Sequence, residues 1–429
     1  MENKFQTYNE FIEAFNKRKE VNYFNVTPIP LKELDEWVFI GNKSYLQHVS
    51  GKFFKIEGLR VKTNFGTVPH EWDQPIINQP EIGILGIITK VFNETRYYLM
   101  QAKMEPGNIN ILQLSPTVQA TKSNFSQVHK GKLPIYLEYF INRKKSEIII
   151  DQLQSEQGGR FLRKRNRNMI VEVKEDINVL DNFFWLTLEE IKELLKINNF
   201  VNMDVRSIIS TIPLIPSSKI PFCYKTYCNK KEILSWFIDQ KVKYELETEK
   251  ISLTEMKNWN ISDDCISHNN DDRFSVIGVE VQAKTREVIS WTQPMIKDLN
   301  IGLVGFIIKK IDGVYHFLVQ TKVMPGNIDI IDLSPTVSCS NYILTKPPFI
   351  DYFNGNKKSK IHCDTIQSEE GGRFYHFQNK NMIVEVDENE ILDIPENYMW
   401  ISYYQMRQFI PQGMFNVESR SLIAAINFI

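Results

Sequence analysis

WDQPIINQPEIGILG, at residues 72–86, recurs 219 positions later as WTQPMIKDLNIGLVG, at residues 291–305. Extended without a gap to residues 119 and 338, the two stretches are identical at 22 of 48 positions. These stretches include LMQAKMEPGN with LVQTKVMPGN and LQLSPTV with IDLSPTV, and farther downstream QSEQGGRF matches QSEEGGRF. Chance does not produce such agreement, so the sequence predicts a tandem duplication of a unit of roughly 200 residues.

Two long copies predict two homologous domains rather than a solenoid, which needs at least three short repeats. The boundary falls in PLIPSSKIP at residues 213–221, where prolines and serines interrupt both helix and strand patterns. We therefore expect an N-terminal domain at 1–213 and a C-terminal domain at 214–429. A pseudo-twofold axis is expected to relate them.

The pattern within each copy predicts an α+β fold. Residues 7–19 and 229–245 have the apolar spacing of helices, and Thr187 with Glu190 forms a capping box. Residues 82–89, 96–104 and 109–120 are rich in Ile, Val, Tyr and Leu and are separated by turn residues, as strands are. We expect mixed β-sheets flanked by helices.

Composition excludes several classes of protein. The 51 basic and 52 acidic side chains give a net charge of −1, which argues against a nucleic-acid-coating protein. No apolar run approaches the ~20 residues of a membrane span, and the N-terminus lacks the apolar core of a secretory signal. We expect a cytoplasmic protein without membrane or nucleic-acid partners. The five cysteines, an odd number without a CxxC pair, argue against disulfides and zinc.

Several catalytic signatures are missing from the sequence. It contains no GxGxxG after a strand, no Walker loop, no HExxH and no GxSxG. Dinucleotide redox chemistry, P-loop hydrolysis, zinc proteolysis and α/β-hydrolase chemistry therefore lack support.

Polar residues that recur in both copies are the first candidates for a site. Gln101 and Lys103 alternate along a predicted strand, so both side chains point to one face. Glu156 and Arg160 flank a Gly-Gly turn at which backbone can approach a ligand. The alternatives are a lysine on an exposed strand face and a salt bridge at a turn.

The copies differ in a basic segment, RKRNRN at residues 163–168 against HFQNKN at residues 376–381. Guanidinium groups beside a glycine turn suit a diphosphate, since Arg binds phosphate oxygens in a bidentate manner. A solvated basic face is the alternative. The first copy also has His129, and Glu105 where the second has Met324. It is therefore predicted to be the better equipped for chemistry.

These segments resemble the NDP-hexose 2,3-dehydratases of deoxysugar biosynthesis. The resemblance rests on WDQPIINQPEIGILG, LMQAKMEPGN, QLSPTVQATKSNF with the HKG after it, LQSEQGGRF, KRNRNMIVE and VNMDVRS, and it covers essentially the whole chain. It implies a dTDP-4-keto-6-deoxyglucose substrate, two Nudix-like domains per subunit, a homodimer, and a 3-ketoreductase acting on the product. The acidic box of a Nudix hydrolase is missing here, so the diphosphate is not expected to be hydrolysed.

The reaction implied by the resemblance needs a base near C3, a donor at the C4 oxygen and an acid for the C2 hydroxyl. We assign Glu156 as the base, Lys103 as the donor, and His129 or His48 as the acid. No metal or redox cofactor is expected, because the substrate already contains the ketone. The predicted substrate-binding residues are Trp72, Gln101, Glu105, Asn108, Ser115, Thr117, Gln119, Gln154, Arg160, Arg163, Arg165, Asn166, Arg167 and Asn168.

The second copy retains enough of these residues for a second site, whether catalytic, ligand-binding or vestigial. Other functions also stay open: a metal-free nucleotide-sugar epimerase or hydrolase, and a non-catalytic nucleotide-sugar-binding protein. The candidate residues of the second site are Gln320, Lys322, Asn327, Ser334, Thr336, Glu369 and Arg373.

Overall fold

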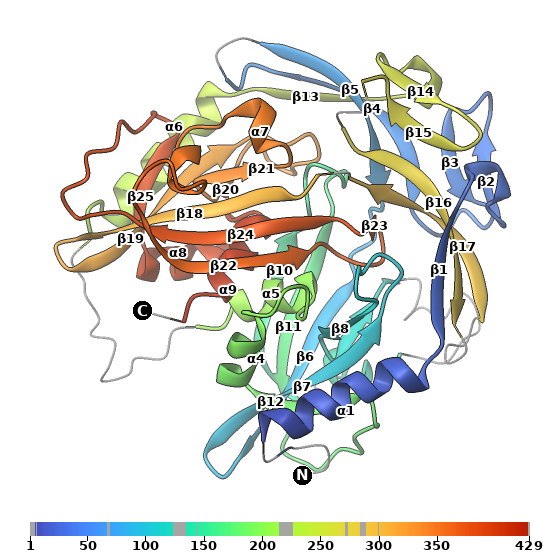
Figure 1. The fold of residues 1–429 in the computed structure, drawn as a ribbon, viewed down its shortest axis with the longest axis horizontal. Helices are drawn as coiled ribbons and strands as arrows, with labels where there is room; N and C mark the ends of the chain where they lie inside the picture. The colour runs from blue at the N-terminus through green and yellow to red at the C-terminus, as the bar shows by residue number, and fades with distance from the viewer. Residues whose placement is uncertain are drawn as a thin grey trace.

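The computed structural model describes residues 5, 7–66, 69–122, 134–142, 144–213, 226–270, 273–283, 289–298 and 300–427. Within these ranges the chain forms two large sheets and two small ones, with helices on their outer faces and between them (Figure 1). The α+β class predicted from the sequence is confirmed.

Each half of the chain contributes one large mixed sheet. The first large sheet has the order β10-β11-β6-β7-β12, and the second has the equivalent order β22-β24-β18-β19-β25. In both sheets one central pair is parallel, β11 with β6 and β24 with β18. A β-bulge recurs at equivalent positions, between Ile148 and Ile150 and between Ile361 and Cys363.

The strands of the first large sheet are β6 (Ile84–Phe92), β7 (Thr95–Met104), β8 (Leu112–Ser115), β9 (Val118–Ala120), β10 (Glu147–Ser155), β11 (Arg165–Glu172) and β12 (Phe183–Thr187). Those of the second are β18 (Gly302–Ile311), β19 (Val314–Lys322), β20 (Asp332–Ser334), β21 (Val337–Cys339), β22 (Lys360–Ser368), β24 (Gln378–Glu385) and β25 (Tyr398–Ser402).

The two small sheets exchange a strand between the halves. The first contains β2 (Trp37–Ile40), β3 (Tyr45–His48), β4 (Lys55–Thr63) and β5 (His70–Asn78), and its edge is β13 (Leu246–Ile251) from the second half. The second contains β14 (Trp259–Ile261), β15 (Cys265–His268), β16 (Ser275–Ala283), β17 (Ser290–Lys297) and β23 (Phe374–Tyr375), and its edge is β1 (Phe24–Ile29) from the first half. Figure 1 shows both small sheets side by side at the right.

The helices and short 3-10 turns complete the layers. They are α1 (Tyr8–Val21), η1 (Leu31–Glu33), α3 (Glu138–Ile141), α4 (Leu188–Leu194), α5 (Met203–Ser210), α6 (Lys230–Lys243), η2 (Leu253–Glu255), α7 (Tyr342–Thr345), η3 (Ile350–Tyr352), α8 (Tyr403–Phe409), η4 (Ile410–Gln412) and α9 (Val417–Ala424). Helices α5 and α9 pack against each other between the two large sheets (Figure 1). This contact lies at the centre of the junction between the halves.

Two arginines fix that junction. Arg206 on α5 donates from Nη2 to the Ser368 carbonyl at 2.6 Å and from Nε to Ser421 Oγ at 2.6 Å. Arg420 on α9 donates from Nη2 to the Ser155 carbonyl and from Nε to Ser207 Oγ. Both arginines are almost fully buried. Each arginine bonds to the opposite half through equivalent atoms, so the two sets of contacts are related by pseudo-twofold symmetry.

Most predicted elements are confirmed. Helices α1 and α6 fall within a few residues of their predicted bounds, and Thr187 with Glu190 forms the predicted capping box at α4. The single strand predicted at residues 109–120 is wrong. It is a turn followed by β8 and β9, because Pro116 provides no N–H for a continuous ladder. The predicted boundary at residues 213–221 lies, apart from Pro213, outside the described residues.

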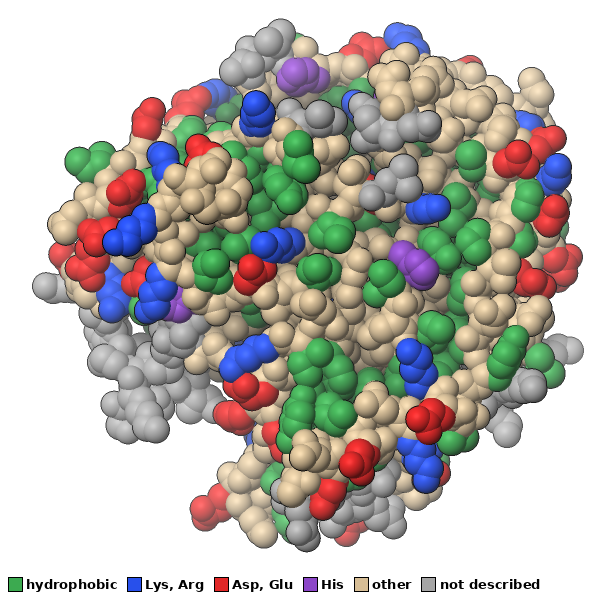
Figure 2. All heavy atoms as spheres, viewed as in Figure 1, with side chains coloured by type: hydrophobic (Ala, Val, Ile, Leu, Met, Phe, Trp, Pro, Cys, Tyr) green, Lys and Arg blue, Asp and Glu red, His purple; other side chains and the backbone are tan. Residues whose placement is uncertain are grey.

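The visible surface agrees with the balanced composition. Figure 2 shows Lys and Arg side chains intermixed with Asp and Glu over this face, without a broad patch of one sign. Within the described part of the chain, no helix is both long and apolar enough to cross a membrane.

Candidate active site

The turn after β7 or β19 in each half meets the Gly-Gly turn of the other half. Gly107, in the turn after β7, donates its N–H to the Gly371 carbonyl at 2.7 Å, and the N–H of Gly326 bonds to Gly158 at the same distance. A Cβ on Gly107 or Gly326 would overlap the backbone carbonyl of Phe374 or Phe161. Glycine is required because the two backbones approach so closely. Each candidate site is therefore built from both halves.

The W-x-Q motif holds the Gly-Gly turn in place. Trp72 Nε1 donates to Gln74 Oε1 at 2.9 Å, and Gln74 Nε2 donates to the Gly159 carbonyl at 2.9 Å. In the second half, Trp291 donates to Gln293 at 3.0 Å, and Gln293 donates to the Gly372 carbonyl at 2.7 Å. Trp72, predicted to bind substrate, thus supports the turn through Gln74.

Lys103 is the centre of a polar cluster that we call the first cluster. Its Nζ donates to Glu105 Oε1 at 2.9 Å and to Gln119 Oε1 at 2.6 Å, while Gln119 Nε2 donates to Asp204. Strand β7 supplies Lys103, β9 supplies Gln119, and the first turn of α5 supplies Asp204. Asn202 caps this helix by accepting from the Val205 N–H at 3.0 Å.

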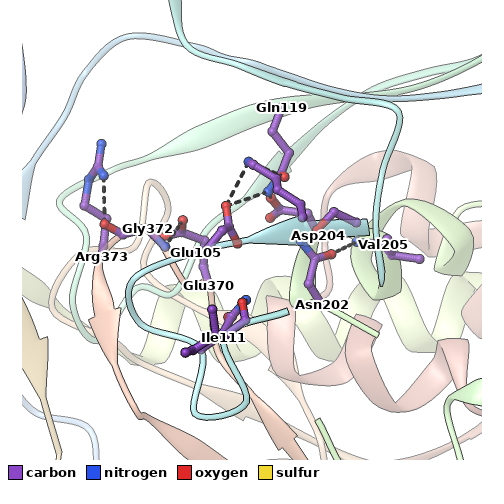
Figure 3. A network of polar contacts seen from close by, with 12 residues as sticks. Glu105, Ile111, Gln119, Asn202, Asp204, Val205, Glu370, Gly372 and Arg373 are labelled. Carbon is purple, nitrogen blue, oxygen red and sulfur yellow. Dashed lines mark hydrogen bonds and ion pairs between the residues drawn. The ribbon is translucent and has the colours of Figure 1, made fainter. Parts of the chain in front are cut away.

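Glu370 of the second half completes the first cluster. Figure 3 shows a row that runs from Arg373 through Glu370 and Glu105 to Gln119 and Asp204. Burial, and then repulsion from Glu105, raise the pKa of Glu370 to about 7. Burial also raises the pKa of Asp204 to about 7, and Glu156 and Glu105 add to the effect. The cluster therefore concentrates carboxyl groups that compete for protons near neutral pH.

The equivalent second cluster lacks most of these groups. Lys322 Nζ donates to Ser338 Oγ at 3.3 Å and to the Ser338 carbonyl. Met324 stands in place of Glu105, Gln157 in place of Glu370, and Glu418 in place of Asp204. Burial lowers the pKa of Lys322, which favours its neutral form.

The two arginines of the Gly-Gly turns also differ. Arg160 Nη2 contacts Asp298 Oδ2 at 3.3 Å, and its guanidinium lies 3.8 Å from the centre of the Phe274 ring. Arg373 lies 4.3 Å from the Phe54 ring centre and, among the described residues, forms no ion pair. The counterpart of Asp298 in the first half is Gln79.

The location of Arg373 differs from its assignment to a second site within the C-terminal half. Its guanidinium is influenced most by burial, then by the charges of Glu370, Glu81 and Glu105. It therefore lies beside the first cluster, because the Gly-Gly turns cross between the halves.

Glu156 and Glu369 lie in closely similar environments. Glu156 Oε1 accepts from Asn166 Nδ2 at 2.7 Å, and Glu369 accepts from Asn379 in the same way. Burial raises the pKa of Glu156 to about 6 and that of Glu369 to about 7, while Arg420 and Arg206, respectively, oppose the shift. These shared contacts are consistent with a role at the junction of the halves.

The predicted basic cluster does not form a single group. Its side chains point in different directions just before and at the start of β11: Lys164 is buried and donates to the Glu81 carbonyl, whereas Arg163, with φ of 50°, and Arg165 are exposed. Arg167 pairs with Asp151, with 2.6 Å between Nε and Oδ1. Arg163 and Arg165 are thus the cations left at the surface of this segment.

Several predicted binding residues have internal hydrogen-bond partners instead. Ser115 accepts from Asn202 Nδ2 at 3.0 Å, and Thr117 Oγ1 accepts from the Ile88 N–H at 2.9 Å. The same internal bonding is found for further candidates: Asn168 with Ser207, Gln154 with the Ile410 carbonyl, Gln320 with the Pro335 and Thr336 carbonyls, Ser334 with Asn416, and Thr336 with the Ile307 N–H.

Three other candidates lie on a strand or in a turn near the clusters. Gln101 is half-buried and faces Ser115 across the β7–β8 ladder. Asn108 and Asn327 are buried in the turns after β7 and β19, against the glycine turn of the opposite half.

Of the two candidate histidines, His48 is not part of the first cluster. His48 lies on β3 in the first small sheet, where Nδ1 is 2.8 Å from Ser50 Oγ and the ring packs against Trp37 and Phe53. His129 lies outside the described residues. Neither Asp204 nor Glu370 was predicted from the sequence. One signal was present for Asp204, because the equivalent position of the second copy also has an acid, Glu418.

The carboxyl groups of the first cluster are not arranged as a metal site. In the described ranges, no group of three or more His, Cys, Asp or Glu side chains could hold a metal ion. The first cluster instead places a lysine, several carboxyl groups and an amide within hydrogen-bonding reach of one another. Such a set can stabilise an oxyanion and transfer protons.

Comparison with known proteins gives the same answer for both halves. A family described as NDP-hexose 2,3-dehydratase matches residues 8–212 and 230–426. The dTDP-4-dehydro-6-deoxy-alpha-D-glucopyranose 2,3-dehydratase of Saccharopolyspora spinosa is 41% identical over 430 residues, covering 95% of this chain and 88% of the relative. Enzymes of the same name from Amycolatopsis orientalis and Streptomyces violaceoruber are 41% and 39% identical, each over 96% of this chain and over 88% and 95% of the relative. The chain belongs to the NDP-hexose 2,3-dehydratase family.

Proposed function

We propose that this chain is a hydro-lyase that removes the C2 hydroxyl of dTDP-4-keto-6-deoxyglucose as water. The observation that carries the proposal is the identity of 39–41%, over at least 95% of the chain, to three enzymes named for that activity. The product is a 3,4-diketo-2,6-dideoxy sugar nucleotide.

The chemistry follows from the ketone at C4. A base removes the C3 hydrogen, and the electron pair forms an enolate whose oxygen is O4. The enolate then expels the C2 hydroxyl, which leaves as water after accepting a proton. The resulting C2–C3 enol takes a proton at C2 and becomes the 3-ketone. Substrate and product differ by one molecule of water, so electrons and atoms balance without an oxidant.

The first cluster suits the first step of this reaction. The C3 hydrogen and the C4 oxygen are on neighbouring carbons, so a base and an oxyanion donor should themselves be neighbours. Lys103 and Glu105 are in contact at 2.9 Å, and Glu105 Oε2 is buried without a hydrogen-bond partner in the described part of the chain. We assign Lys103 as the donor to O4 and Glu105 as the base at C3.

Glu156 is the rival base. It faces Asn166 and Arg420 in the arrangement that Glu369 repeats in the second half, which supports a role at the junction rather than in proton abstraction. The same comparison supports catalysis by one cluster. Met324 cannot act as a base, so the second cluster is proposed to be non-catalytic.

The direct test is incubation of the purified protein with dTDP-4-keto-6-deoxyglucose and a 3-ketoreductase with its reductant. We expect a trapped 2,6-dideoxy sugar nucleotide, and activity should persist after chelation of divalent metals. A stable epimer, a nucleoside monophosphate with a sugar phosphate, or binding without turnover would each contradict the proposal and indicate an epimerase, a hydrolase or a binding protein, respectively.

Further features extend the proposal. We infer a Nudix-like scaffold in each half, a homodimer, a cytoplasmic location and a 3-ketoreductase as the next enzyme, as the family resemblance implies. Arg163 and Arg165 are exposed beside the Gly-Gly turn and remain proposed ligands of the diphosphate.

A further inference from the structure

We propose that Glu370, supplied by the second half of the chain, is the acid that protonates the departing C2 hydroxyl. This assignment rests on the proposed function and concerns a residue outside the half that supplies Lys103 and Glu105. It replaces His48 in that role on structural grounds, and it needs no residue outside the described ranges.

Backbone contacts between the halves position Glu370 beside Glu105. The N–H of Gly107 bonds to the Gly371 carbonyl at 2.7 Å, and the N–H of His376 bonds to the Gly107 carbonyl at 2.8 Å. A Cβ on Gly371 would lie 2.8 Å from the Cβ of Glu105, which is closer than real Cβ atoms approach. The turn that carries Glu370 therefore lies directly against the turn that carries Glu105.

Each of the two carboxyl groups has one oxygen that accepts a hydrogen bond and one buried oxygen that, among the described residues, has no partner. Glu370 Oε1 accepts from the Gly372 N–H at 2.6 Å, and Glu105 Oε1 accepts from Lys103 at 2.9 Å. In the described ranges, Oε2 of Glu370 and Oε2 of Glu105 are buried without a hydrogen-bond partner. Buried polar atoms are rarely left in this state, so both oxygens are available to a ligand.

The two carboxyl groups differ in the charges that surround them. The ammonium of Lys103 directly balances the charge of Glu105. Glu370 faces Glu105, Asp204 and Glu156, with Arg373, Lys164 and the Gly372 N–H opposing them. Burial and Glu105 raise the pKa of Glu370 to about 7, so a substantial fraction is protonated at neutral pH. One carboxyl group is thus suited to accept a proton, and the other to donate one.

The second cluster provides an internal comparison. Gln157 occupies the position equivalent to Glu370, and Met324 the position equivalent to Glu105. An amide has no proton to give to a leaving hydroxyl, and a thioether cannot remove one from carbon. The second cluster therefore has neither the acid nor the base at these two positions.

The test compares two leaving groups in the variant Glu370→Gln. One substrate is dTDP-4-keto-6-deoxyglucose, and the other is its 2-deoxy-2-fluoro analogue, from which fluoride leaves with much less need for a proton. We expect water elimination to fall by at least ~100-fold, the usual scale for a lost general acid, while fluoride release stays close to the wild-type rate. Exchange of the C3 hydrogen in D2O should also be retained, because the base is intact.

The matched control is Glu418→Gln, which removes a carboxyl group from the second cluster and should leave both eliminations unchanged. In the wild type, water elimination should decline as pH rises through the pKa of Glu370, and fluoride elimination should not. If Glu370→Gln disturbs folding, Glu370→Ala is assayed with the same two substrates.

The outcomes separate this assignment from the proposed function. Equal loss of both eliminations would make Glu370 a base or a structural residue, and unchanged water elimination would remove it from the chemistry. A wild-type protein that eliminates neither leaving group would overturn the proposed function and this assignment together.

Discussion

Lys103 and Lys322 are the same residue at equivalent positions of equivalent strands, yet their surroundings differ. Lys103 contacts the carboxylate of Glu105, whereas Lys322 contacts the hydroxyl and carbonyl of Ser338. Burial lowers the pKa of Lys322, and the charge of Glu418 opposes this shift. Residue identity alone is therefore a weak guide to which half performs the reaction.

The first prediction distinguishes the two possible bases. Glu105→Gln should reduce single-turnover dehydration by at least ~100-fold, since a general base contributes about that much. Glu156→Gln and Glu369→Gln remove equivalent carboxyl groups at the junction and should have similar, smaller effects. The measurement is rapid-quench dehydration of the sugar nucleotide after circular dichroism has established that each variant is folded.

If the Glu156 variant loses more activity than the Glu105 variant, the role of base returns to Glu156. In that case Glu156→Gln would lose activity while Glu105→Gln and Glu369→Gln retained it. Equal loss in the two junction variants alone would instead indicate that the junction must be intact for either cluster to form.

The sequence identified part of the first cluster. Lys103 was selected because it recurs in both copies, Glu105 because the second copy has Met324 in its place, and Gln119 because it lies in a segment that resembles the family. Glu370 was missed because its neighbour in space is the other half, and repeat alignment compares equivalent positions instead of contacting ones. The basic residues at 163–167 were overinterpreted as a group, since Lys164 is buried and Arg167 pairs with Asp151.

At the level of the strand, the exchange of β1 and β13 is the feature that the sequence could not predict. Phe24 pairs with Ala283 and Leu246 pairs with Thr63, so each strand lies at the edge of the small sheet of the other half. Because the two copies are homologous, each strand has a pattern that fits either small sheet. The choice between these two pairings depends on how the halves are placed relative to each other. The local sequence pattern of a strand carries no information about that placement.

The exchange predicts that neither half folds as a stable monomer. Residues 1–213 alone would expose the edge of β4 that β13 covers, and residues 226–429 alone would expose the edge of β16 that β1 covers. Each half would also bury an arginine, Arg206 or Arg420, without its partners in the other half. Uncovered sheet edges and unsatisfied buried charges both favour aggregation or unfolding.

The test is expression of the two halves separately and together, followed by size-exclusion chromatography and circular dichroism. We expect each half alone to be unfolded or aggregated, and the co-expressed pair to form a complex that regains dehydration. A cooperative thermal transition in a monomeric single half would contradict this prediction. The full-length chain serves as the reference for both measurements.

On the scale of the whole molecule, the buried carboxyl groups make stability depend on pH. The folded-state pKa is raised to about 6 for Glu156 and to about 7 for Asp204, Glu369 and Glu370. In the unfolded chain these groups return to ordinary values near 4, so the folded state binds more protons between about pH 4 and pH 7. Their contribution to the free energy of unfolding is therefore fully present at low pH and lost as pH rises through the folded-state pKa.

Glu369→Gln should remove one part of this dependence, because glutamine resembles the protonated acid in shape and keeps the acceptor for Asn379. Glu369 is 6% exposed, so solvent screens it little. The contribution of such a group to the free energy of unfolding should fall by on the order of 2 kcal/mol between pH 5 and pH 8. The variant should thus match the wild type at pH 5 and be more stable at pH 8, as measured by chemical denaturation at both values. If the variant is equally destabilised at both pH values, Glu369 is ionised in the folded chain and its charge is balanced by Arg206. In that case the junction is held by an ion pair and not by a protonated acid.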